Sequence, residues 1–185
     1  MPENGLLDDA STPLIRGSVE LLDGVFDALV VPARWCRGAY AKDAEGERIE
    51  GRILDAVEGR EVASRCMLGE LLHQGLARGY RIEVATESEP ADQIAVEVRH
   101  AAASWWLAAL ACDRVAWGLN EEHARRNDEL LARYTSPEPD PPGRIVLWLT
   151  SWNDTATHEE AITCVVLAAQ MLRAELNRRA KGGAR

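Results

Sequence analysis

One long run of apolar residues constrains the fold of this 185-residue chain more than any other feature of its sequence. Between residues 91 and 117 the apolar side chains recur at steps of four and three, which places them on one face of an α-helix. Trp106 and Leu110 widen that face, and so broad an apolar surface belongs in the centre of a core or against a partner. We therefore expect the stretch 94–115 to form the most buried helix of a mainly α fold. The residues of the repeat are Ile94, Val98, Ala101, Trp105, Ala108, Cys112 and Val115.

Two shorter apolar repeats predict helices ahead of this one. The first covers about residues 19–30, and Ser18 can cap it because a serine hydroxyl accepts from a free N–H of the first turn. The second covers about residues 65–78, with Ser64 as its N-cap and Gly79 as the residue that ends it. Each repeat has enough large apolar residues to bury one face of its helix.

The C-terminal third alternates between helical and helix-breaking segments. Asn120 can cap a helix over 121–134, whose Glu and Arg residues pair at a spacing of four and mark a solvated surface helix. The proline-rich segment 136–143 cannot be a regular helix and is expected to be a stiff loop. Residues 145–152 fit either a helix or a strand, and we favour the helix. The last helix starts at 157–160, where a Thr and a Glu have capping-box spacing.

Residues 38–50 differ in character from the helical segments. A turn-prone cluster, Asp43–Gly46, separates two short runs there, which predicts a small β-hairpin near 38–50. Together with the helical repeats, this predicts a mainly α fold of about five or six helices around one core. We expect residues 1–16 to form a flexible leader, 17–179 a single globular domain and 180–185 a basic tail.

Net charge and hydropathy argue against two classes of partner. The chain carries a formal net charge of −9, so its surface repels phosphate and general nucleic-acid binding is not expected. No segment reaches the roughly 18 apolar residues of a membrane span, and the N-terminus lacks the apolar stretch of a signal peptide. We therefore expect a cytoplasmic protein without membrane contact, whose cysteines stay reduced.

The sequence predicts neither a metal site nor a cofactor. Cys36, Cys66, Cys112 and Cys164 are far apart, and none belongs to a CxxC pair of the kind that binds zinc. The glycine-rich motifs that bind nucleotide phosphates are missing from the sequence. The HExxH and GxSxG motifs of zinc proteases and serine hydrolases are missing as well.

Three short blocks combine a bulky or thiol residue with Gly, Asn or Asp, the residue types that form turns and helix ends. They are Trp35–Tyr40, Cys66–Gly69 and Trp152–Asp154. We expect the blocks to meet in the fold, with Trp35, Cys66 and Trp152 in one contact layer. A glycine in each of the first two blocks would allow the backbones to approach closely. Asn153 and Asp154 would then lie at the rim of the contact, tying down the hairpin or facing a shallow pocket.

Cys66 allows two interpretations. In the first turn of a helix, free N–H groups and the helix dipole lower the pKa of a thiol, so Cys66 could be the nucleophile of an enzyme. Asn153, Asp154 or His158 would then assist it. In the second interpretation, which we favour, Cys66 is a small buried packing residue, because nothing in the sequence places a base beside it. A base within about 3.5 Å of the sulfur in an open cleft would indicate the enzyme, and a sealed thiol the packing residue.

The aromatic residues of the blocks are candidates for a ligand site. Trp35, Tyr40 and Trp152 each lie beside turn-forming residues, so they could bind a small ligand through their rings. Core packing is the alternative role for such residues.

Taken together, the blocks W-x-x-G-A-Y, C-x-x-G and W-N-D resemble a family of small uncharacterised proteins of actinobacteria and their phages, catalogued as a domain of unknown function. The resemblance covers roughly residues 19–176 and implies no known activity. One departure is Glu70, where we expect a small residue. We expect a cytoplasmic accessory protein that binds a host or phage protein, with a cysteine-dependent hydrolase or transferase as the alternative. The wide apolar face of 91–117 also allows a homodimer.

Overall fold

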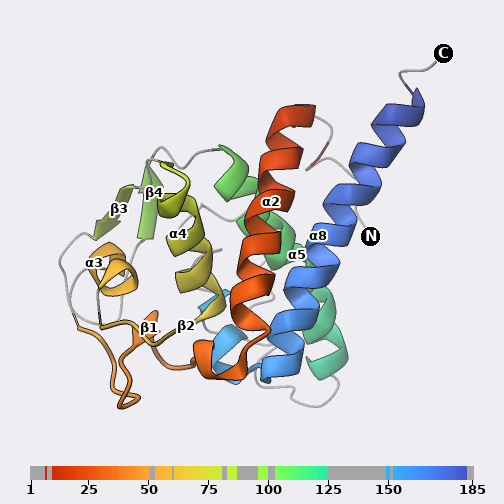
Figure 1. Ribbon diagram of the computed structural model, residues 1–185. Helices are drawn as coiled ribbons and strands as arrows, with labels where there is room; N and C mark the ends of the chain where they lie inside the picture. Colours follow the sequence, from red (N-terminus) through yellow and green to blue (C-terminus); the bar gives the residue numbers. More distant parts are fainter. Residues whose placement is uncertain are drawn as a thin grey trace.

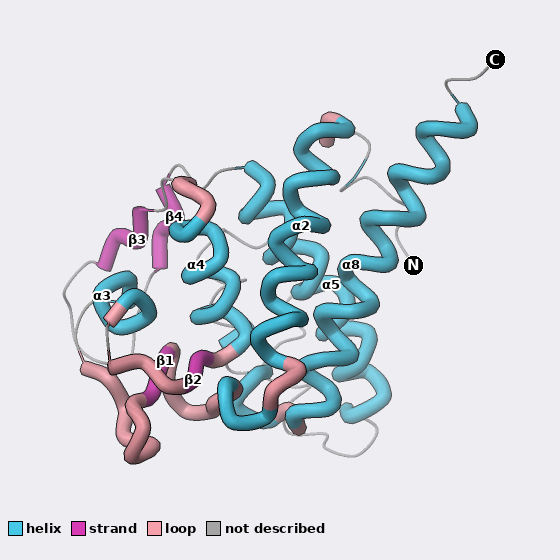
Figure 2. The backbone as a smooth tube through the Cα atoms, viewed as in Figure 1, coloured by secondary structure: helices cyan, strands magenta, loops and turns pink. Residues whose placement is uncertain are grey.

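The computed structural model describes residues 7, 10–50, 53–59, 61–80, 83–86, 96–99, 103–124, 149–150 and 152–182. Over these residues the protein is mainly helical with short antiparallel strand pairs, so the predicted fold class is confirmed (Figure 1 and Figure 2). The elements are α2 (Thr12–Leu29), a short 3₁₀ helix η1 (Pro32–Arg34), β1 (Ala41–Lys42), α3 (Ile53–Glu58), β2 (Ser64–Arg65), α4 (Met67–Ala77), β3 (Glu83–Thr86), β4 (Val96–Arg99), α5 (Ala103–Ala124) and α8 (His158–Gly182).

Three long helices form the centre of the fold. α2, α5 and α8 each pack against the other two, α4 packs against α2, and α3 packs against α4. Figure 1 shows α2 between α4 and α8, with α3 and the short strands grouped beyond α4. This arrangement surrounds the apolar face of α2 with helices from later parts of the chain.

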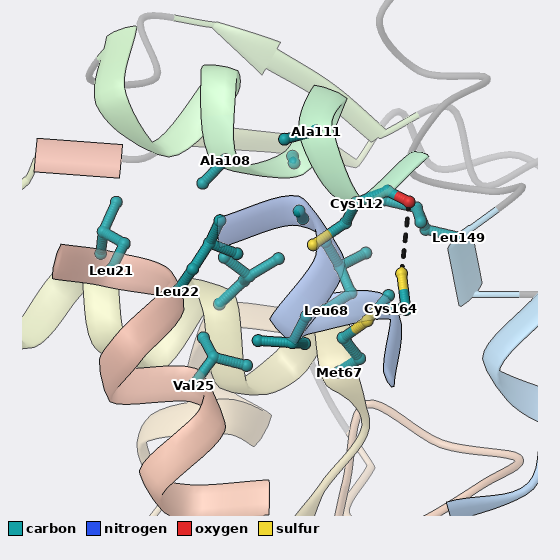
Figure 3. Packing of buried hydrophobic residues seen from close by; sticks show 14 of the residues in the cluster. Leu21, Leu22, Val25, Met67, Leu68, Ala108, Ala111, Cys112, Leu149 and Cys164 are labelled. Atoms are coloured by element: carbon teal, nitrogen blue, oxygen red, sulfur yellow. Dashed lines mark hydrogen bonds between the residues drawn. The ribbon is translucent and has the colours of Figure 1, made fainter. Parts of the chain in front are cut away.

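The core lies where α2, α4, α5 and α8 meet (Figure 3). Trp105 and Cys112 of α5 have no exposed surface, in agreement with the burial predicted for this helix. The Cys164 thiol of α8 donates to the Cys112 carbonyl oxygen at 3.3 Å, so a weak donor inside the core is paired. Burial of large side chains contributes about 1.5–3 kcal/mol each to folding. The fully buried aliphatic side chains include Ile15, Leu21, Leu22, Leu29, Met67, Leu68, Leu71, Leu149 and Leu172.

Helix α2 begins at Thr12, so the predicted start near residue 19 is wrong. Its N-cap is Ser11, whose hydroxyl accepts from the backbone N–H of Leu14 at 3.4 Å. Ser18, the predicted cap, is buried within the helix, and its hydroxyl lies 2.9 Å from the carbonyl oxygen of Leu14. The same hydroxyl lies 2.8 Å from the carbonyl oxygen of Ser104. Ser18 therefore joins α2 to α5 instead of starting α2.

Part of the predicted leader is held against the C-terminal helix. Residues 12–16 belong to α2, and the guanidinium of Arg179 on α8 donates to the carbonyl oxygens of Leu7 and Ala10. Arg179 is itself oriented by Glu175, which accepts from its Nε. The globular domain therefore starts ahead of residue 17.

The long predicted helix over 91–117 is wrong at residues 96–99. Val96–Arg99 form β4, which pairs antiparallel with β3, and the helix α5 starts at Ala103. The segment Val-Glu-Val-Arg alternates apolar and charged residues, which is the two-residue period of a strand. Its β-branched valines also favour a strand, so these residues form a strand although the apolar spacing also fits a helix. Ile94 and Ala101 lie outside the described residues.

Residues 41–49 fold back on themselves as predicted, although the principal partner of β1 is distant in sequence. The turn is closed by a hydrogen bond from the Asp43 N–H to the Glu47 carbonyl at 3.1 Å, and Lys42 and Arg48 form an isolated antiparallel bridge. β1 pairs antiparallel with β2, so the small sheet joins the hairpin region to the residues just before α4.

The ends of α4 and α8 follow the sequence signals closely. Gly79 adopts a positive φ of 76° just after α4, which confirms it as the terminating residue. Before α8, the Thr157 N–H donates to the Glu160 carboxylate at 2.7 Å and the Glu160 N–H donates to the Thr157 hydroxyl at 3.2 Å, which is the predicted capping box. α8 continues to Gly182, so the first residues of the predicted tail are helical.

The segment predicted to run from the helix over 121–134 to residue 152 is described by the structure only at its two ends. α5 runs through Asn120 to Ala124, so Asn120 is not an N-cap. Residues 125–148 lie outside the described ranges, and with them most of the predicted solvated helix and the proline-rich loop. Leu149, Thr150 and Trp152 are helical, in line with the favoured interpretation of that segment. Within the described part of the chain, no helix has the length and apolar character to cross a membrane.

Candidate functional site

The three sequence blocks meet at the side chain of Asn153. Its Oδ1 accepts from the indole N–H of Trp35 at 3.0 Å and from the backbone N–H of Met67 at 3.1 Å. Its Nδ2 donates to the carbonyl oxygen of Cys36 at 3.1 Å. Asn153 has no exposed surface, so the prediction that it lies at a rim is wrong. We call this arrangement the Asn153 junction.

Asp154 strengthens the junction from the solvent side. It is exposed, and its Oδ1 accepts from the backbone N–H of Gly38 at 2.7 Å. Gly38 has a positive φ of 75°, a conformation that favours glycine over residues with a side chain. The first and third blocks are therefore joined by two adjacent residues of the chain.

The second block approaches the first more closely than any side chain would allow. A Cβ on Gly69 would lie 2.2 Å from the carbonyl oxygen of Tyr40, and the same carbonyl accepts from the Cys66 N–H at 3.1 Å. Gly69 therefore provides the close approach that the sequence predicted. Glu70, the departure from the family pattern, is buried and turned toward Arg65, with 3.5 Å between carboxylate and guanidinium.

Cys66 is sealed in the structure. It is the N-cap of α4, in place of the predicted Ser64, and its Sγ accepts from the Gly69 N–H at 3.2 Å. The thiol has no exposed surface, and burial raises its pKa to about 12 although the Gly69 hydrogen bond opposes that rise. The lowered pKa that the nucleophile interpretation requires is therefore not found. These contacts support the packing interpretation.

The three residues that could have assisted Cys66 are engaged elsewhere. Asn153 and Asp154 hold the junction, and the His158 Nε2 lies 2.7 Å from the Leu29 carbonyl oxygen. Because a carbonyl oxygen can only accept, Nε2 carries the proton in this contact. His158 thus fixes the end of α2 to the start of α8 and makes no catalytic pair with Asp154.

The aromatic candidates pack against other parts of the described protein. Trp152 is only 5% exposed, and the ring of Trp35 has His158 at 5.4 Å and the Arg37 guanidinium at 5.6 Å. Burial raises the pKa of Tyr40, whose hydroxyl is hydrogen-bonded to Thr150. All three side chains belong to the core or pack against it.

A separate cavity of about 560 Å³ opens beside α2 and α4, and we call it the α2–α4 pocket. Residues from α2, η1, the segment 62–65 and α4 form its walls. Charged and amide groups are prominent among them. The lining residues are Gly24, Asp27, Ala28, Arg34, Val62, Ala63, Arg65, Glu70, His73, Gln74 and Arg78.

A network of hydrogen bonds holds one wall of this pocket. Arg65 donates from Nε to the Val57 carbonyl oxygen at 2.7 Å and faces Glu70, which also accepts from the Gln74 amide at 2.7 Å. Arg78 donates to the Gln74 Oε1 at 2.6 Å and reaches across to the Glu20 carbonyl oxygen at 3.1 Å. These bonds fix the wall of α4 against α2.

Two groups of the pocket have unused hydrogen-bonding capacity. The Arg34 side chain makes no hydrogen bond or ion pair with any residue that the structure describes. The Nδ1 of His73 is buried without a partner. Burial, together with the Arg65 guanidinium, lowers the pKa of His73, so its ring is neutral near pH 7.

The α2–α4 pocket was not predicted from the sequence. Glu70, Gln74 and Arg78 recur at steps of four opposite the leucine stripe of α4, which marks a polar face. Arg34 and Arg65 each directly precede a block, Trp35 and Cys66. No sequence pattern joined these separate segments into one cavity. The described residues also contain no cluster of His, Cys, Asp or Glu that could hold a metal ion.

Comparison of the chain with protein-family models, with curated proteins and with solved structures gave no significant match. The resemblance to the actinobacterial and phage family therefore stays a prediction that rests on the three blocks.

Proposed function

We propose that this protein acts by binding another protein, as a cytoplasmic accessory protein of an actinobacterium or one of its phages. The observation that carries the proposal is an apolar exposed segment, Val30–Ala33, which we call the ridge. All four of its residues are exposed, and Val30 and Val31 are 47% and 42% exposed. Removing neighbouring apolar side chains from water is favourable in free energy, so an exposed group of them favours binding to a partner.

The ridge is held in one conformation. The Val30 N–H donates to the Phe26 carbonyl at 2.8 Å, and the Trp35 N–H donates to the Pro32 carbonyl at 3.2 Å. Beyond it, the Trp35 indole is fixed by Asn153. A rigid segment loses little conformational entropy on binding. Less of the free energy gained by burying its apolar surface is therefore lost to ordering, and the affinity is higher. The Asn153 junction therefore serves the proposed function indirectly, by presenting the ridge.

The cysteine-dependent enzyme is not part of the proposal. A thiol without exposed surface and with a raised pKa cannot attack a substrate unless the fold opens. Native protein should therefore react with a thiol reagent at Cys66 only at the rate of local unfolding. Rapid labelling of Cys66, with an apparent pKa well below the ordinary value of about 8.5, would favour the enzyme instead.

The ridge is tested by affinity capture from actinobacterial cells, with and without phage infection. The double variant Val30→Asp/Val31→Asp should lose a partner that the wild-type protein retains, because two carboxylates would have to be desolvated on binding. Leu167→Asp is the matched control, since Leu167 is 40% exposed on α8 and lies outside the ridge. Capture of the same proteins by all three forms would contradict the proposal.

A second copy of the chain is one candidate partner. Sedimentation of the wild-type protein at high micromolar concentration tests this case directly. A dimer that persists in the wild type and in Leu167→Asp, and dissociates in the double variant, would identify the ridge as the dimer contact.

A further inference from the structure

We propose that the α2–α4 pocket binds an oxyanion, a carboxylate or phosphate group of a small ligand, through the guanidinium groups of Arg34 and Arg65. The volume of about 560 Å³ lies within the range of about 300–1,000 Å³ that is usual for small-molecule sites. Binding of such a ligand does not depend on the proposed protein-binding function, because it uses the guanidinium groups of Arg34 and Arg65 instead of the apolar side chains of the adjacent ridge and can be measured on the isolated protein.

The charge of the pocket walls is opposite to that of the whole molecule. The walls contain the three arginines Arg34, Arg65 and Arg78 against the two carboxylates of Asp27 and Glu70, with a neutral histidine. The chain as a whole carries −9. A local excess of positive charge in a concave site attracts anions in spite of the acidic surface around it.

One of the two carboxylates is already matched inside the protein. Glu70 is 4% exposed and is shared between the Gln74 amide and the Arg65 guanidinium. Asp27 is exposed on α2, so water screens its charge. Glu70 offsets the charge of Arg65, and the screened Asp27 does not offset both Arg34 and Arg78, so a net positive charge remains toward a ligand within the cavity.

Two arginines have donors that the described protein does not use. Arg65 engages Val57 through Nε and Glu70 through Nη1, which leaves its Nη2 without a partner among the described residues. The Arg34 guanidinium has none of its donors engaged within the described part of the chain. A guanidinium presents its donors as a planar fork, which matches two oxygens of a carboxylate or phosphate.

The pocket is also pre-formed. Arg65 is only 16% exposed and is held by the Val57 carbonyl, and Arg78 is fixed between Gln74 and Glu20. At Gly24 a Cβ would lie 2.5 Å from the Gln74 Oε1, so the lack of a side chain there leaves room for the amide that orients Glu70 and Arg78. A ligand would find these donors already positioned and would order little besides Arg34.

The test is titration of the isolated full-length protein with inorganic phosphate and with citrate, at constant ionic strength, followed by calorimetry and by the NMR signals of the arginine Nε–H groups. We expect saturable binding of at least one anion, with shifts at Arg34 and Arg65. Arg34→Gln should weaken the binding at least tenfold, because it removes a charged pair of donors, and the Arg34 side chain has no partner among the described residues whose loss could disturb the fold. Arg16→Gln is the matched control, an exposed arginine of α2 outside the pocket, and should bind as the wild type does.

The ratio of the two affinities distinguishes a phosphate-bearing from a carboxylate-bearing ligand. Linear, non-saturating responses to both anions, or equal affinity in wild type and Arg34→Gln, would overturn the inference. Loss of partner capture by the ridge variant with anion binding intact would leave both proposals standing. Failure of capture in every form, with anion binding still dependent on Arg34, would refute the protein-binding proposal alone.

Discussion

The Asn153 junction and the α2–α4 pocket are both polar regions in contact with α4. They differ in how far their hydrogen-bonding groups are paired within the protein. At the junction, one buried amide satisfies an indole N–H, a backbone N–H and a carbonyl oxygen, each from a distant part of the chain. In the pocket, a buried ion pair lies beside guanidinium donors that no described residue accepts from. The polar groups of the Asn153 side chain are all matched within the protein, whereas some guanidinium donors of the pocket have no partner among the described residues.

This difference distinguishes residues that are needed for folding from residues that are available for binding. The three sequence blocks contain residues of the first kind, because an unmatched polar group inside the protein is costly in free energy. The Arg34 guanidinium and the Nη2 of Arg65 have no partner among the described residues, which favours a bound anion as the reason for their presence in the pocket. Substitutions should therefore affect stability in one region and binding in the other.

The largest effect is expected for Asn153→Ala. The change leaves the Trp35 indole N–H, the Met67 N–H and the Cys36 carbonyl without their partner, and should destabilise the protein by about 3–5 kcal/mol. Asn177→Ala, at an exposed position of α8, is the control and should change stability by less than about 0.5 kcal/mol. Chemical denaturation measures both. A loss below about 1 kcal/mol for Asn153→Ala would show that the junction does not hold the fold.

A smaller loss, about 2 kcal/mol, is expected for Gly69→Ala. Alanine in place of glycine stabilises a helix by about 1 kcal/mol. At position 69, however, the Cβ of alanine would collide with the Tyr40 carbonyl oxygen, so the start of α4 must move away from the first block. Gly118→Ala on α5 is the matched control, because a Cβ there meets nothing within 4 Å. The control should be neutral or stabilising in thermal unfolding. Equal behaviour of the two variants would remove the close approach from the description of the junction.

Asp154→Ala should cost about 1 kcal/mol. Its carboxylate accepts the Gly38 N–H at 2.7 Å, but the side chain is exposed, so water can replace part of the lost bond. Denaturation in the same buffer provides the comparison with Asn153→Ala. A loss as large as that of Asn153→Ala would mean that the exposed and buried halves of the junction act as one unit.

The smallest effect on stability is expected for Arg34→Gln, within about 0.5 kcal/mol of the wild type. The side chain is exposed and has no partner among the described residues, so the fold does not depend on its charge. A marked destabilisation in thermal unfolding would place Arg34 with the junction and would remove the contrast between the two regions.

The sequence patterns that correctly predicted helix ends were local ones. The capping box at Thr157 and Glu160 and the stop at Gly79 depend on residues within one turn, and the structure contains both. The apolar spacing was insufficient around Val98, because its helical neighbour in the repeat, Ile94, lies four residues before it, while Val96 lies two residues before it and fits a strand. Ser18 was misplaced for a related reason, since a serine inside a helix can bond to the preceding turn and to a neighbouring helix.

The junction could be predicted in outline and the pocket could not. Residues such as Trp35, Gly69 and Asn153 are specific enough to suggest that their segments meet, although the sequence does not reveal which one is central. An arginine such as Arg34 or Arg65 is an ordinary surface residue in sequence. Whether its charge is matched depends on which segments the fold brings beside it, and here those segments are α2, η1, residues 62–65 and α4.

The Asn153 junction also has a consequence for the order of folding during synthesis. Its hydrogen bonds span 86 to 118 residues of sequence, so the contact order of this region is high and its closure is slow. At roughly 5–20 residues per second, the ribosome needs about 4–17 s to proceed from Met67 to Asn153. Throughout that interval the Trp35 and Met67 donors lack the Asn153 side chain that accepts from them in the folded protein. The nascent N-terminal half should therefore be sensitive to proteolysis until residue 153 has left the ribosome, and ribosome-bound chains truncated on either side of that position should show the change.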